Sequence, residues 1–200
     1  MQVPDHVRAA ADKPLYNHRS QPMDDLLAKL ETECRHVFGT GGDVLFLAGS
    51  GTGAMESAIC NLTSPGEKIM VIVGGTFAGR WVQIAKAYGL TVREVEVDWR
   101  RGATVEEVEN GLRQWPHAEV VFHTWSESST GVLNDMGEVG KLIRSHNKLL
   151  VADAVSGLAI SPLHMDDKNI DAVVVGSQKG LMLPPGLGVV AAGPRAWEKV

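Results

Sequence analysis

The sequence predicts an α/β fold: a mainly parallel sheet of seven strands with helices on both of its faces. Short apolar segments recur along the 200 residues, and segments with helical spacing separate them. The apolar segments are continuous rather than alternating, which is typical of parallel strands that helices cover on both sides. Small polar residues follow several of these segments, at the edge of the sheet where ligands bind in such folds.

The chain begins with a stretch rich in proline and polar residues, and we expect an N-terminal arm over residues 1–23. A helix is predicted to start at Asp24 as its N-cap, with apolar residues at helical spacing as far as Phe38. Glycines from Gly39 to Gly42 end that helix. Residues 24–200 contain no interdomain linker, so we expect them to form one domain.

The rest of the chain alternates between predicted strands and predicted helices. The predicted strands span residues 44–48, 68–73, 92–97, 118–124, 149–152, 172–175 and 188–192. The further predicted helices span residues 54–62, 77–88, 104–114 and 136–145. Thr104 and Glu107 have the spacing of a capping box at the start of the third of these helices. A polar loop is expected from Trp125 to Asn134.

Composition excludes several classes of protein. Apolar residues make up 44% and charged residues 22%, as is usual for a globular protein in water. The net charge is −5 and no basic run exceeds Arg100-Arg101, which argues against a nucleic-acid partner. No apolar stretch is long enough for a membrane span, and no signal peptide is recognisable. Cys34 and Cys60 form no disulfide or metal pattern, so we expect a cytoplasmic protein.

One lysine follows the apolar strand over residues 172–175. The strand leads into Gly176-Ser177-Gln178 and then Lys179. A lysine at the mouth of an apolar strand is expected to lose its proton easily, because burial disfavours the charged form. A neutral amine attacks carbonyl carbons, so Schiff-base chemistry is the natural use of Lys179. The alternative is an ordinary surface lysine in a loop.

A glycine-rich loop, Gly49 to Gly53, follows the first strand. Glycines let the backbone approach a ligand, and the start of the next helix offers free N–H groups to an anion. Ser50 and Thr52 add hydroxyl groups. The loop also fits a weak dinucleotide signature, but the next strand ends in Gly74 instead of the acidic residue that a ribose would require. We therefore expect a single compact phosphate.

Other polar residues end neighbouring strands. Asp153 follows four apolar residues, and a carboxylate there needs a cationic partner unless it only caps a helix or loop. His123 is interpreted as a hydrogen-bonded structural histidine, and Phe77 as either core or ligand-facing. The run from Glu127 to Thr130 is a candidate for a simple polar turn.

Five stretches together resemble the class V aminotransferases, which are pyridoxal-phosphate enzymes of fold type I. The stretches are Gly49–Glu56, Glu127–Leu133, Val151–Ser156, Gly176–Lys179 and Pro184–Gly186. Within that family the chain is most similar to the alanine–glyoxylate and serine–glyoxylate (serine–pyruvate) aminotransferases. The resemblance covers nearly the whole chain and implies the large, cofactor-binding domain of fold type I.

The resemblance assigns roles to individual residues around pyridoxal 5'-phosphate. Lys179 would hold the cofactor as a Schiff base, and Asp153 would pair with its protonated ring nitrogen. Phe77 would stack on the ring, and Ser128 would lie near the phenolic oxygen of the ring. The residues that would bind the phosphate are Ser50, Gly51, Thr52 and Gln178. Residues 17–19 resemble the part of the arm that lines the substrate entrance.

The resemblance also implies a reaction and an assembly. The expected reaction moves an amino group from a small amino acid, alanine or serine, to a 2-oxo acid such as glyoxylate or pyruvate. The expected assembly is a homodimer without metal, nucleic acid or membrane. Family members carry a further C-terminal small domain that supplies the arginine for the substrate carboxylate, so we expect the large-domain portion here.

Several alternatives stay open at this point. The same cofactor serves lyases, desulfurases and epimerases of the family, although desulfurases usually have a histidine where Phe77 stands. A large domain without turnover and a nicotinamide-binding domain are the remaining interpretations.

Overall fold

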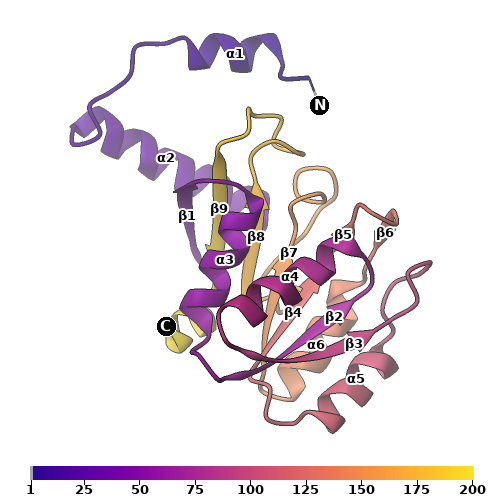
Figure 1. The fold of residues 1–200 in the computed structure, drawn as a ribbon. Coiled ribbons are helices and arrows are strands. Elements are labelled where there is room, and N and C mark those ends of the chain that lie inside the picture. The colour runs from indigo at the N-terminus through magenta and orange to yellow at the C-terminus, as the bar shows by residue number, and fades with distance from the viewer. Residues whose placement is uncertain (1) are drawn as a thin grey trace.

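The computed structural model describes residues 2–200 and confirms the predicted α/β fold with a seven-stranded sheet (Figure 1). The strands of this sheet are β1 (Asp43–Ala48), β2 (Lys68–Val73), β3 (Thr91–Glu96), β4 (Val120–Thr124), β7 (Leu149–Asp153), β8 (Ala172–Gly176) and β9 (Leu187–Ala192). Their order across the sheet is β1-β9-β8-β7-β4-β2-β3. Only β9 pairs antiparallel with both of its neighbours, so the sheet is mainly parallel, as expected.

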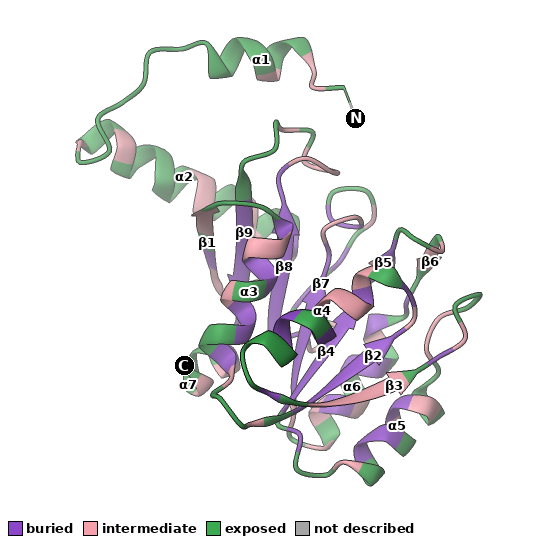
Figure 2. Ribbon diagram, in the orientation of Figure 1, coloured by how far each residue is buried: buried purple, intermediate pink, exposed green. Residues whose placement is uncertain are grey.

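Helices cover both faces of the sheet. The helices in the described part of the chain are α1 (Asp5–Ala11), α2 (Gln21–Phe38), α3 (Gly51–Leu62), α4 (Thr76–Ala87), α5 (Val105–Gln114), α6 (Met136–Ser145) and α7 (Pro194–Lys199), and all except α1 pack on the sheet. The apolar side chains of α3, α4 and α7 pack on one face, and those of α5, α6 and the end of α2 pack on the other. Every residue of β4, β7 and β8 is buried, as Figure 2 shows, which explains why these strands read as continuous apolar runs.

The N-terminal arm differs in detail from the prediction. Helix α2 begins at Gln21, so the assignment of Asp24 as its N-cap is wrong. Ser20 is the N-cap with extended backbone, and Pro22 fits the first turn because that turn needs no N–H donor there. Helix α1 has no buried residue, and Leu15 after it is 94% exposed. Figure 1 shows this arm leading away from the sheet.

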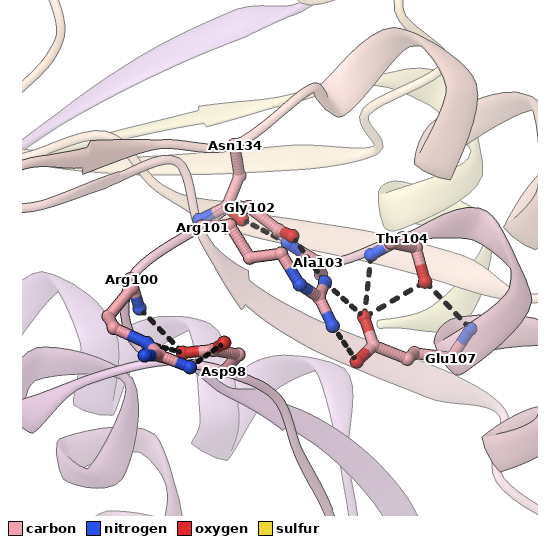
Figure 3. Close-up of polar contacts among 8 residues, drawn as sticks. All are labelled: Asp98, Arg100, Arg101, Gly102, Ala103, Thr104, Glu107 and Asn134. Atoms are coloured by element: carbon pink, nitrogen blue, oxygen red, sulfur yellow. Dashed lines mark hydrogen bonds and ion pairs between the residues drawn. The ribbon is translucent and has the colours of Figure 1, made fainter.

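The start of α5 has the predicted capping box (Figure 3). The Glu107 N–H donates to Thr104 Oγ1, and a Glu107 carboxylate oxygen accepts from the Thr104 N–H. Arg101 donates to both carboxylate oxygens of Glu107, and this bond lowers the pKa of Glu107 to about 2. Asn134 ties the same loop to the sheet, since its Oδ1 accepts from the Ala103 N–H and its Nδ2 donates to the Thr124 carbonyl. The loop is therefore anchored at the end of β4.

The segment from Trp125 to Asn134, predicted as a plain loop, contains a small hairpin. Its strands are β5 (Ser126–Glu127) and β6 (Val132–Leu133). The Gly131 N–H donates to the Glu127 carbonyl, and Gly131 has a φ of 80°, which glycine adopts without strain. Helix α7 was also not predicted. No helix in residues 2–200 combines the length and apolar character that crossing a bilayer requires.

A buried aspartate, Asp171, joins α6, β7 and α7 at the end of the sheet opposite these loops. Arg144 and Arg195 place nitrogens 3.0 and 3.2 Å from its Oδ1, and the Leu150 N–H donates to its Oδ2. Burial raises the pKa of Asp171, and the backbone bond and both arginines act in the opposite direction. This carboxylate therefore has the charge partners that a buried ion requires.

His123 in β4 is buried without a partner. The residue is 1% exposed, and neither ring nitrogen forms a hydrogen bond within the described part of the chain. The prediction of a hydrogen-bonded histidine is therefore wrong. Burial lowers the pKa of His123 to about 4, because the apolar surroundings disfavour the charged ring.

We expect His123→Leu to reduce the loss of stability in acid. Unfolded histidine titrates near 6.5, so below that pH the unfolded state binds a proton that the folded state refuses. The stability is complete above pH 6.5 and is lost as the pH falls toward 4; by linkage the loss at pH 5 is about 2 kcal/mol. Urea unfolding at pH 8 and pH 5 measures it, with the exposed His117→Leu as control. An unchanged difference between the two pH values in His123→Leu would contradict this explanation.

Candidate active site

The carboxyl ends of β1, β2, β4, β7 and β8 lie at one edge of the sheet, and the segments that follow them form a pocket. Every residue that the resemblance assigns to the cofactor lines this pocket, although these residues come from five separate segments. These residues are Ser50, Gly51, Thr52, Phe77, Ser128, Asp153, Gln178 and Lys179. None of residues 2–23 lines the pocket, so the structure does not bring residues 17–19 to it.

The first turn of α3 forms one wall of the pocket. Ser50 is the N-cap, and its Oγ accepts from the Gly53 N–H at 3.2 Å. The first N–H groups of a helix have no partner within the helix and carry partial positive charge, so this wall suits an anion. A side chain at Gly51 would bring Cβ to 2.8 Å from Val155 Cγ2. Glycine is therefore needed where α3 packs closely on the segment after β7.

Asp153 lies at the base of the pocket and is 5% exposed. Its Oδ1 accepts from the Val155 N–H at 2.9 Å, and no basic side chain within residues 2–200 forms an ion pair with it. Burial raises the pKa of Asp153 to about 6, and the nearby Glu127 charge adds to the rise. The Val155 N–H, Arg80 and Lys179 act in the opposite direction. The expected cationic partner is therefore not a protein side chain among the described residues.

Lys179 lies in the turn after β8 and is half-buried. The turn is fixed by Ser177, whose Oγ donates to the Pro184 carbonyl at 2.7 Å and whose N–H donates to the Leu187 carbonyl. Lys179 Nζ has no hydrogen bond or ion pair in the described part of the chain. Its surroundings are more polar and more open than the sequence predicted, because Asp153 and several serines line the same pocket.

Phe77 and Arg80 project from the first two turns of α4 into the pocket. The Arg80 guanidinium lies over the Phe77 ring, 5.2 Å from its centre, and Arg80 Nη1 donates to Thr52 Oγ1 at 2.9 Å. Sequence reasoning missed Arg80. Its spacing of three residues from Phe77 on a predicted helix was the one signal in the sequence, because such residues share a face.

Glu127 is a buried carboxylate that fixes the start of α4. Its Oε2 accepts from the N–H groups of Phe77 at 3.1 Å and Ala78 at 2.9 Å, and its Oε1 accepts from Ser129 N–H and Oγ. A side chain at Gly75 would bring Cβ to 2.3 Å from Glu127 Cγ. The segment is the predicted polar turn, but it also positions the helix that carries Phe77.

Two serines complete the rim of the pocket. Ser128 Oγ and Ser156 Oγ lie 2.7 Å apart, and Ser126 lines the same wall. The pocket thus combines a helix N-terminus with hydroxyl groups, an aromatic ring, a buried carboxylate, and two cations that pair with no acidic side chain among the described residues. This set fits a ligand with a phosphate at one end and a protonated ring nitrogen at the other. Residues 2–200 hold no cluster of His, Cys, Asp and Glu placed to bind a metal ion.

Comparison with known proteins gives consistent matches. The family model described as aminotransferase class-V matches residues 7–200. The small subunit of a soluble hydrogenase from a Synechococcus species is 37% identical over 98% of the chain and 52% of the relative. An L-aspartate–glyoxylate aminotransferase from Paracoccus denitrificans is 36% identical over 99% of the chain and 51% of its own length.

Among solved structures, an alanine–glyoxylate aminotransferase from a Nostoc species matches with a TM-score of 0.95 and 30% identity. The match covers 99% of this chain and 52% of that one. The chain therefore spans about half the length of the relatives it matches.

We expect Glu127→Gln to destabilise the fold by about 1–3 kcal/mol. The amide nitrogen cannot accept the N–H groups that one carboxylate oxygen now accepts, so buried donors of α4 or of Ser129 lose their partner. Chemical unfolding measures the change. Glu106→Gln is the matched control, because Glu106 is exposed in the first turn of α5. Equal stability of the two variants would show that Glu127 does not anchor α4.

Proposed function

The chain belongs to the class V aminotransferases, and we propose that it is the cofactor-binding large domain of a pyridoxal-phosphate-dependent aminotransferase. Residues 24–200 would form that domain, and residues 1–23 its N-terminal arm. The observation that supports the proposal most is the meeting of Lys179, Asp153 and the first turn of α3 around one pocket.

The phosphate group would bind at the start of α3. Backbone N–H groups of Gly51 and Thr52 and the hydroxyl group of Ser50 would donate to it, and the helix dipole would favour its charge. Gln178, which lines the same wall, would add a side-chain amide. A helix N-terminus of this kind is a common binding site for a compact phosphate.

Phe77 would stack on the ring of the cofactor, and Asp153 would pair with the ring nitrogen. A protonated ring nitrogen is the cation that Asp153 lacks within residues 2–200, and ionised Asp153 would hold the proton on that nitrogen. Ser128 would meet the phenolic oxygen of the ring. When bound, pyridoxal 5'-phosphate supplies an electron sink for the carbanion that forms at the substrate α-carbon.

Lys179 would have two tasks. Its Nζ would hold the cofactor through the aldehyde group, and the same nitrogen would act as the base that takes up and returns the substrate α-proton. No hydrogen bond within residues 2–200 competes for this nitrogen. Its half-buried position keeps it accessible to substrate.

The substrates are proposed from the relatives. The Paracoccus and Nostoc proteins share glyoxylate in their names and differ in the donor. We therefore propose a small 2-oxo acid, glyoxylate or pyruvate, as the acceptor, and a small amino acid such as alanine or serine as the donor.

The arm supports a proposal about assembly. Leu15 and Tyr16 are exposed apolar side chains on a segment that leaves the sheet, and such a segment gains stability by packing on a second copy. We propose a homodimer. Light scattering and an activity assay test it, and a monomer that retains activity would refute it.

We also propose a reducing, cytoplasmic location, which agrees with Cys34 and Cys60 being free thiols.

We expect Lys179 to be the lysine that takes up the cofactor. Protein incubated with pyridoxal 5'-phosphate and reduced with borohydride should yield one modified peptide, the one that contains Lys179. Lys179→Ala should give no adduct, and Lys29→Ala, a change on the exposed face of α2, should give the adduct as before. An adduct on another lysine, or bound cofactor that leaves Lys179 unmodified, would overturn the proposal.

A further inference from the structure

Arg80 is a half-buried cation in the pocket without an acidic partner among the described residues. Seven arginines of residues 2–200 pair with a carboxylate within 4.0 Å, namely Arg8, Arg35, Arg100, Arg101, Arg113, Arg144 and Arg195. Arg80 forms no such pair within that range, although it lines the pocket. Partial burial of a cation costs free energy unless an anion pairs with it.

The contacts of Arg80 hold it at one end of the pocket. Its Nη1 donates to Thr52 Oγ1 at 2.9 Å, and its guanidinium covers the Phe77 ring. Thr52 belongs to the first turn of α3, so the Arg80 charge lies beside the N–H groups of that turn. A guanidinium has five N–H donors in a planar fork, and one bond to Thr52 leaves others free for a ligand.

We infer that Arg80 is the charged partner of the phosphate group, and that it holds Thr52 and Phe77 in place for the same ligand. The inference rests on the proposed function for the identity of the ligand. The helix N-terminus and hydroxyl groups alone provide only partial charges, whereas Arg80 adds a full positive charge to this wall. The Arg80 charge also acts on Asp153, because it opposes the rise in the pKa of that carboxylate that burial causes.

The test compares ligands with and without the phosphate. The dissociation constants of pyridoxal 5'-phosphate and of pyridoxal are measured by absorbance and tryptophan fluorescence for wild type, Arg80→Met and Arg80→Lys. Methionine keeps an unbranched stem without charge, and lysine keeps the charge without the fork. Arg113→Met, a change at an exposed arginine of α5, is the matched control.

We expect Arg80→Met to weaken the binding of pyridoxal 5'-phosphate by about ten- to a hundredfold and to leave the affinity for pyridoxal nearly unchanged. Arg80→Lys should lose less than Arg80→Met. Inorganic phosphate should raise the unfolding temperature of wild type and Arg113→Met, and should have little effect on Arg80→Met. The unfolding temperature without ligand shows whether each variant is folded, and Arg80→Lys serves if Arg80→Met is not.

An equal loss of affinity for both ligands would overturn the inference, because it would show that Arg80 only holds Thr52 and Phe77 in position. Unchanged affinity for both ligands, with a raised KM for the amino acid, would overturn it as well and would assign Arg80 to the substrate carboxylate. If wild type responds to phosphate through Arg80 but forms no adduct on Lys179, the proposed function fails and the phosphate site stands.

Discussion

A buried carboxylate without a cationic partner among residues 2–200 is the constraint on which this site depends. Two aspartates in the described part of the chain are buried, one at the end of β7 and one just before β8, and their surroundings differ. Asp171 at one end has two arginines and a backbone donor, whereas Asp153 at the other end has one backbone donor and faces a pocket. An ionised Asp153 is therefore costly in the free protein, and a cationic group of a ligand would remove that cost.

The remainder of the pocket is organised to place such a ligand. The register of β4 and β7 sets Thr124 beside Asp153, and Asn134 ties the end of β4 to the loop before α5. Glu127 then fixes the start of α4 and with it Phe77. These hydrogen bonds connect the end of β4 with the segments that follow β2, β3 and β4, so they hold the groups of the pocket in place relative to the sheet.

Sequence reasoning predicted much of this arrangement because parallel strands end at one edge. The apolar runs located the strands. Because Ser50, Asp153 and Lys179 each stand at or after the carboxyl end of a predicted parallel strand, the sequence alone was enough to group them at that edge. Contacts between helices were not predictable in this way. Arg80 contacts Thr52 only because α3 and α4 lie side by side. The sequence also did not distinguish His123 from other polar residues at strand ends, although no hydrogen-bond partner among the described residues reaches it. Backbone detail decided the start of α2, where Ser20 caps the helix instead of Asp24.

The most direct test of the role of Asp153 is its titration with and without the cofactor. Carbon-13 NMR of labelled aspartate carboxyl groups follows it, and Asp153→Asn assigns the signal. We predict a pKa of about 6 in the free protein, and a fall below the ordinary aspartate value of about 3.9 once pyridoxal 5'-phosphate is bound. A pKa near 3.9 in the free protein, or one that the cofactor leaves unchanged, would contradict this role.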